Sequence, residues 1–198
     1  METFEKYYES VENVDIPERD SNGEIPMEWY TTPLKPRIIA YHGGSNFDDF
    51  SLDYLGQGEG ARYSMKQALG PGIYFSNCKN AASAYTKYAA NKAIHKVELD
   101  TTNLYDQRNG TPHINKAFEE ILKKLGKTED DGPFRYDGVY GGLFRVMDVK
   151  SAIKMLVNHG IDGVFTRLPI GCYEISVINP NIIKKLDKEL IDDNIKEN

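Results

Sequence analysis

The sequence predicts an α+β domain, and three observations lead to this prediction. Short β-prone runs recur along the chain, at 37–42, 73–75, 94–100, 161–166 and 173–178. Apolar residues spaced three and four apart predict helices between them, over 81–93, 113–125 and 149–159. The chain has 198 residues, enough to bury one good core. Strands and helices interspersed over this length favour one domain with peripheral segments at its ends.

Three regions are expected along the chain. Residues 1–36 form an acidic N-terminal arm, with prolines at 17, 26, 33 and 36 that favour irregular structure. Residues 37–183 hold the predicted strands and helices and form the main domain. Residues 184–198 are polar and are expected to form a C-terminal tail that is a fraying helix.

The charge of the chain limits its expected partners. The formal net charge is −6 and there is no run of lysine or arginine, which argues against a broad grip on nucleic acid. A small anionic nucleotide remains compatible, because glycine-rich backbone and a helix N-terminus can hold phosphate without making the protein basic. No apolar run is long enough to cross a bilayer, so no membrane partner is expected.

The chain start and the cysteines indicate where the protein acts. The opening METFEKYYESVENVD is acidic and resembles neither a secretory signal nor a transit peptide, so the expected location is the cytoplasm. Cys78 and Cys172 are the only cysteines. Two are too few for a disulfide framework or a cysteine-based zinc site, and neither is expected to have a special role. No metal is expected.

The segment 69–88, LGPGIYFSNCKNAASAYTKY, is the most informative stretch. A glycine-proline-glycine turn precedes a short strand, and an alanine-rich helix follows. Tyr74 on the strand and Tyr85 on the helix could face each other across a slot. Taken alone, the pair is better explained as core packing, because tyrosines at helical spacing are usually buried.

Two further polar residues stand at strand positions. His42 ends an apolar strand just before Gly43 and Gly44, an arrangement found where backbone meets a ligand. A structural hydrogen bond is the alternative for this histidine. Glu174 lies within an apolar strand, where a carboxylate is costly to bury without a partner or a role. A water-exposed edge strand is the alternative for Glu174.

In chain order, these residues resemble the His-Tyr-Glu branch of the ADP-ribosyltransferases, which includes diphtheria-toxin-like toxins and the poly(ADP-ribose) polymerases. The likeness consists of His42-Gly43, Tyr74 within GPGIYFS, Tyr85 and Glu174 in EISVINPNII. The segment GIDGV at 160–164 adds to a similarity with the compact transferase domains of phage polyvalent proteins. The resemblance covers about residues 37–183 and implies two small packed, mainly antiparallel sheets with flanking helices.

The resemblance also implies roles for these residues in the chemistry of NAD. Tyr74 and Tyr85 sandwich the cationic nicotinamide ring, whose charge is attracted by aromatic faces. Gly43 offers backbone hydrogen bonds to the carboxamide, and His42 binds a hydroxyl of the adenosine-side ribose. Glu174 binds the nicotinamide-ribose 2′-hydroxyl and stabilises the oxocarbenium-like centre that forms when nicotinamide leaves. Glu174, His42 and Tyr74 are thus the expected catalytic residues.

Two positions depart from the family pattern. The polymerase relatives have a serine in the first helical turn that contacts nicotinamide, where this chain has Ala82. Either Ser83 replaces it in binding NAD after a small shift, or this contact is missing. Cys172 stands two residues before the glutamate, where arginine-specific members have Glu or Gln, so arginine is a less expected acceptor.

The function expected from the resemblance is transfer of one ADP-ribose from NAD to a macromolecular acceptor, most simply a protein, with release of nicotinamide. For a phage-encoded protein, the site of action would be the host cytoplasm. An NAD glycohydrolase and a non-catalytic module that binds NAD or ADP-ribose are the alternatives. RNA 2′-phosphotransfer is disfavoured, because the chain has no basic cluster for the phosphate.

Overall fold

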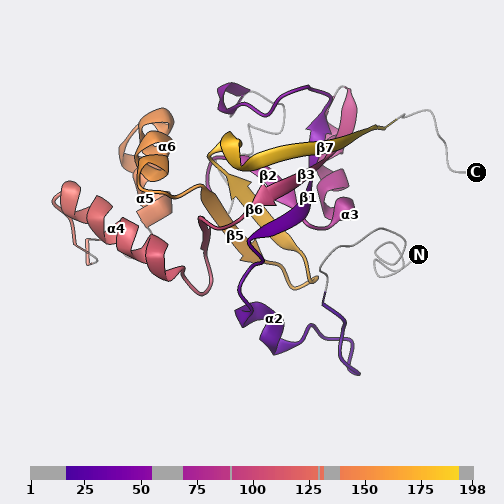
Figure 1. Cartoon of the computed structure of the whole chain (residues 1–198), viewed down its shortest axis with the longest axis horizontal. Helices are drawn as coiled ribbons and strands as arrows, with labels where there is room; N and C mark the ends of the chain where they lie inside the picture. The colour runs from indigo at the N-terminus through magenta and orange to yellow at the C-terminus, as the bar shows by residue number, and fades with distance from the viewer. Residues whose placement is uncertain (1–16, 55–68, 90, 129, 132–138, 192–198) are drawn as a thin grey trace, which may run out of the picture.

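The computed structural model describes residues 17–54, 69–89, 91–128, 130–131 and 139–191 (Figure 1). The first sixteen positions of the predicted acidic arm therefore lie outside the described residues. Seven strands form one mixed sheet in the order β4-β5-β6-β2-β1-β3-β7. Together with the helices, this sheet confirms the predicted α+β class.

The strands cover the predicted β-prone runs. They are β1 Arg37–Ser45, β2 Ile73–Ser76, β3 Lys92–Asp100, β4 Leu104–Asp106, β5 Gly163–Arg167, β6 Tyr173–Val177 and β7 Ile183–Leu190. The helices are α2 Met27–Thr31, α3 Lys79–Ser83, α4 Pro112–Lys124, α5 Val139–Val146 and α6 Val149–Asn158, with 3-10 turns η1 Leu52–Tyr54, η3 Ala84–Tyr88 and η5 Pro180–Ile182. The helices expected over 113–125 and 149–159 are confirmed as α4 and α6. The α6 start is capped by Asp148, whose side chain accepts from Ser151 N.

The structure has one sheet, whereas the family resemblance implies two. All strand pairs are antiparallel except β4 with β5. The two halves of the sheet are joined by β1 and β2, which pair at a single register position, Tyr41 opposite Ser76. The strands therefore separate beyond this position, where continued register would place Gly43 opposite Tyr74.

Three elements differ from the sequence prediction. The glycine-rich, aromatic stretch 136–146 predicts a hairpin or an irregular crossing, but Val139–Val146 form helix α5. The tail expected to be helical begins instead as β7, which pairs along β3. Lysine, glutamate and leucine favour a helix, but pairing with the exposed edge of β3 outweighs this propensity. The helix expected over 81–93 is shorter, because α3 ends at Ser83 and continues only as the 3-10 turn η3.

The core has two main parts. One apolar cluster lies among α4, α5 and α6, which gather at one side of the molecule (Figure 1). The other lies under the sheet, where Trp29 of α2 joins side chains from β1, β2 and β6. Helix α3 contacts β1 separately. No helix in the described part of the chain is long and apolar enough to span a bilayer.

Candidate functional site

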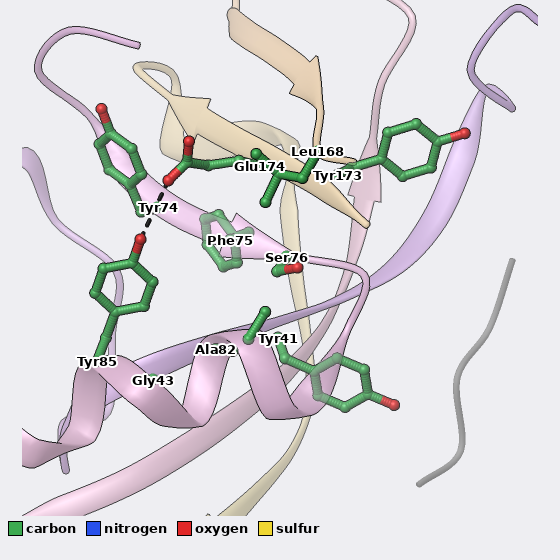
Figure 2. Close-up of a pocket in the computed structure, with 11 residues that line it drawn as sticks. Tyr41, Gly43, Tyr74, Phe75, Ser76, Ala82, Tyr85, Leu168, Tyr173 and Glu174 are labelled. Atoms are coloured by element: carbon green, nitrogen blue, oxygen red, sulfur yellow. Dashed lines mark hydrogen bonds between the residues drawn. The ribbon is translucent and has the colours of Figure 1, made fainter. Parts of the chain in front are cut away.

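A pocket lies where β1 and β2 separate, bounded by β1, β2, α3 with η3, and β6 (Figure 2). It brings together four of the sequence-predicted site residues: Gly43, Tyr74, Tyr85 and Glu174. The remaining lining residues were not predicted as site residues: Tyr41, Phe75, Ser76, Ala81, Ala82, Leu168 and Tyr173. They escaped prediction because most are apolar residues whose type indicates only burial.

The pairing of β2 with β6 places Tyr74 and Glu174 on the same face of the sheet. Ser76 is the register partner of Glu174, and Tyr74 is the partner of Ser176. Side chains two positions apart along a strand share a face, so Tyr74 and Glu174 are diagonal neighbours. Glu174 is half-buried rather than placed on an open sheet edge, because β6 lies between β5 and β2.

Tyr85 closes the other side of the pocket. Its hydroxyl donates a hydrogen bond to Glu174 Oε1 at 3.1 Å. Figure 2 shows the carboxylate reaching from β6 towards the gap between the rings of Tyr74 and Tyr85. The Tyr74 hydroxyl donates to the carbonyl of Gly70 at 2.8 Å, which fixes that ring from the preceding turn. Two aromatic rings and one carboxylate therefore meet at this pocket.

Both tyrosine hydroxyls stay protonated over the physiological pH range. Burial, followed by the nearby charge of Glu174, raises the pKa of Tyr85 to about 12. The same two causes, again with burial first, raise the pKa of Tyr74 further. Tyr85 is thus a neutral hydrogen-bond donor to the carboxylate, and neither ring carries a charge that would compete with Glu174.

His42 lies beside the pocket rather than in its lining. Its ring packs among Phe47, Phe50, Phe75 and His95, with centroids 5.6 to 5.9 Å away. Its Nδ1 lies 2.8 Å from the carbonyl oxygen of Tyr74, and because a carbonyl can only accept, Nδ1 carries the proton. This hydrogen bond spans the gap where β1 and β2 separate, so His42 is tied to the backbone of a pocket residue.

Burial lowers the pKa of His42 to about 4, with a smaller contribution from the neighbouring His95. The hydrogen bond to Tyr74 opposes this shift. The histidine is therefore neutral near pH 7, and its Nε2 has the character of an acceptor.

Gly43 and Ser83 are explained by local packing. A Cβ built on Gly43 would lie 1.9 Å from the carbonyl oxygen of Ala82, so glycine allows α3 to lie directly on β1. The Ser83 hydroxyl donates to the carbonyl of Asn80 at 2.8 Å, and Ser83 does not line the pocket. Ala82 lines it instead.

The expectation that neither cysteine has a special role is wrong. Cys78 and Cys172 form a disulfide, and both side chains are fully buried. The β2–β6 register pairs Ser76 with Glu174, and continuing it by two residues places Cys78 opposite Cys172. Composition could not reveal this pair, because the two cysteines are separated by 94 residues and only the strand pairing brings them together.

Comparisons with known proteins add no evidence on function, so the evidence is the geometry of the pocket. No family model matches the chain, and no match was found among curated proteins or solved structures. Among the residues that the structure describes, no group of three or more His, Cys, Asp or Glu side chains could hold a metal ion.

Proposed function

We propose that this chain is an ADP-ribosyltransferase that moves a single ADP-ribose from NAD to a protein acceptor and releases nicotinamide. The observation that carries the proposal is the meeting of Glu174 with the rings of Tyr74 and Tyr85 in one pocket. Two aromatic faces suit a flat cationic ring, and a carboxylate beside them suits a sugar that develops positive charge.

The reaction breaks the bond between the nicotinamide nitrogen and C1′ of the ribose. The bonding electrons leave with nicotinamide, which becomes a neutral ring, and the ribose acquires oxocarbenium character. The acceptor nucleophile then forms the new bond to C1′ and gives up its proton. In this proposal Glu174 binds the ribose 2′-hydroxyl, stabilises the developing charge and orients the acceptor.

Two neighbouring residues complete the proposed NAD site. Gly43 lies on the part of β1 beyond the single pairing with β2, so its backbone faces the pocket and suits the nicotinamide carboxamide. His42 supports the strand from beside the pocket through Tyr74, and its Nε2 would accept from a ribose hydroxyl. We leave Ser83 out of the proposed site because it does not line the pocket, and its hydroxyl donates to the Asn80 carbonyl.

An ADP-ribosyltransferase-like fold, with two small sheets, is part of the same proposal. The single register position that joins β1 to β2 supports it, because the sheet is nearly divided there. We place the reaction in the cytoplasm, because NAD is an intracellular metabolite, and in the host cytoplasm for a phage-encoded protein. In this compartment the buried Cys78–Cys172 disulfide would have to resist reduction, because the cytoplasm keeps most thiols reduced.

Labelling with NAD that carries a tag on its adenylate tests the proposal. Wild type incubated with cell lysate should label protein, and Glu174→Gln should lower the labelling rate by about two to three powers of ten. This substitution keeps the size of the side chain and an acceptor for Tyr85, so the variant should remain folded and bind NAD. Equal labelling by the two proteins would contradict the mechanism.

The same assay separates the alternatives. Free ADP-ribose released without lysate, and no labelled protein with it, would indicate an NAD glycohydrolase. Measurable NAD binding without nicotinamide release would indicate a non-catalytic module. Intact-mass analysis of proteins from cells that express wild type or Glu174→Gln would identify the acceptor.

A further inference from the structure

The two walls of the pocket are joined at one end by two neighbouring links. Cys78 forms a disulfide with Cys172, and the Asn77 side chain accepts a hydrogen bond from Tyr173 N at 2.7 Å. Asn77 and Cys78 lead from β2 into α3, whereas Cys172 and Tyr173 lead into β6. A covalent bond and a buried hydrogen bond thus hold the turn between β2 and α3 against the start of β6.

Each end of the disulfide leads directly to a residue of the proposed NAD site. Glu174 lies on β6, two positions after Cys172. The β2–β6 register that pairs Ser76 with Glu174, if continued, places Cys78 opposite Cys172. On the other side, Cys78 is the N-cap residue of α3, and η3, which carries Tyr85, continues directly from that helix. The hydrogen bond from Tyr85 to Glu174 closes the loop of contacts that begins at the disulfide.

We infer that the Cys78–Cys172 disulfide is a positioning element of the pocket, so that turnover depends on the oxidation state of these cysteines. The inference rests on the proposed function, because it assumes that Glu174 and Tyr85 act on NAD. Reduction by a dithiol breaks the S–S bond, leaves a thiol on each cysteine and converts the dithiol to its own disulfide. Without the bond, the turn that leads to Tyr85 is held against the strand of Glu174 only by the Asn77 hydrogen bond and the β2–β6 pairing.

The expected loss is larger in kcat than in KM. A displacement of about 1 Å at a reacting centre can lower the rate about a hundredfold, and we expect a fall of about ten- to a hundredfold in kcat. The KM for NAD should change less, because Tyr74 remains fixed through Gly70 and continues to bind the ring. Both cysteine side chains are buried, so a reductant reaches the disulfide only through local opening of the surrounding structure, and native reduction should be slow.

Steady-state release of nicotinamide tests the inference in the oxidised wild type and in the double variant Cys78→Ala/Cys172→Ala. Alanine suits a fully buried site and leaves no lone thiol. Leu156→Ala is the matched control, because Leu156 is fully buried in the helical cluster and does not line the pocket. The control lowers stability and should keep the wild-type kcat at a temperature where it is folded.

A tenfold or greater fall in kcat for the folded double variant, with the control unchanged, supports the inference. Equal kcat and KM in wild type and double variant overturn it, as does a loss that the control shares. Wild type reduced slowly with dithiothreitol should lose the same activity and regain it on reoxidation. Reduction and reoxidation of the wild type therefore test the inference if the double variant does not fold.

Hydrogen exchange supplies a measurement that does not depend on NAD chemistry. Exchange over 79–88 and 172–177 should be faster in the double variant, while exchange over α6 stays as in wild type. Unchanged exchange in both pocket segments overturns the inference. If the oxidised wild type releases no nicotinamide, the proposed function fails, but this measurement still decides whether the disulfide holds the pocket walls together.

Discussion

Tyr85 and Glu174, which lie 89 positions apart in the chain, share a 3.1 Å hydrogen bond across the candidate pocket. The tyrosine donates and the carboxylate accepts, and the raised pKa of Tyr85, about 12, keeps the donor protonated. The hydroxyl therefore orients the carboxylate while the ring forms one wall. Tyr85 is half-exposed, so its ring can move to admit a ligand without disturbing the core.

Substitutions at Tyr85 should separate these two contributions. Tyr85→Phe keeps the ring and removes one hydrogen bond to a charged group, worth about 1 kcal/mol at a half-exposed position, so kcat should fall about fivefold with little change in KM. Tyr85→Ala removes the ring as well and should also raise the KM for NAD. Lys87→Ala, on the same turn, is the control. Equal KM values for the Phe and Ala variants would show that the ring does not bind nicotinamide.

Gly43→Ala should destabilise the fold, because its Cβ would lie 1.9 Å from the backbone carbonyl of Ala82. A backbone atom cannot turn aside as a side chain can, so α3 must shift, at a cost of about 1 to 3 kcal/mol in the free energy of unfolding. Gly141→Ala is the matched control, because nothing lies within 4 Å of that Cβ in α5. The control should raise stability by up to about 1 kcal/mol. Urea unfolding measures both, and equal midpoints would contradict the packing argument.

The sequence was informative where local pattern decides structure. The alternation in 94–100 and the apolar stripe of 113–125 each predicted an element that the structure contains, β3 and α4. Tyr74 and Tyr85 were expected to face a common slot, and both line one pocket. These predictions succeeded because strand and helix periods are properties of short segments.

Features that depend on strand pairing could not be predicted. Whether 183–190 pairs with β3 depends on an edge that lies far away in the sequence, and local propensity favoured a helix. The side of the sheet that receives the His42 ring depends on how β1 meets β2, and the pattern RIIAYHGG does not contain that information. The Cys78–Cys172 pair has the same origin, because the β2–β6 register aligns the two cysteines.

Stability should fall on mild acidification because of His42. Its pKa is about 4 in the folded protein, below the usual 6.5, so the unfolded chain binds the proton more readily. The stabilisation from the neutral, buried ring is complete above about pH 6.5 and is lost as the pH falls towards 4, by up to about 3 kcal/mol. His95, whose pKa burial also lowers, acts in the same direction.

Urea unfolding at pH 7.5 and pH 5 measures this effect. His42→Gln keeps a donor for the Tyr74 carbonyl but does not titrate, so its unfolding free energy should depend less on pH in this interval. Identical pH dependence in wild type and His42→Gln would assign the effect to other groups.

Breaking the buried ion pair between Arg167 and Asp106 should destabilise the fold more than breaking an exposed ion pair. Arg167 Nη1 lies 2.6 Å from Asp106 Oδ2, and both side chains are almost fully buried. Arg167 also donates to the Thr32 carbonyl, which ties the segment after α2 to β5. Arg167→Met leaves the buried Asp106 carboxylate without a countercharge, although Arg108 N, Asn109 N and Asn109 Nδ2 still donate to it. The variant should therefore lower the free energy of unfolding by about 3 kcal/mol, the lower end of the range for a broken buried pair.

The exposed pair Lys188 and Asp48, with Nζ and Oδ1 3.2 Å apart, is the matched control. Water screens both of its charges, so Lys188→Met should change stability by less than about 1 kcal/mol. Adding Asp106→Asn to Arg167→Met should recover part of the loss, because no lone charge then remains buried. If the loss of unfolding free energy in the double variant equals the sum of the losses in the two single variants, the ion pair itself contributes little. Arg167→Met should keep the wild-type KM for NAD, because neither member of the pair lines the pocket.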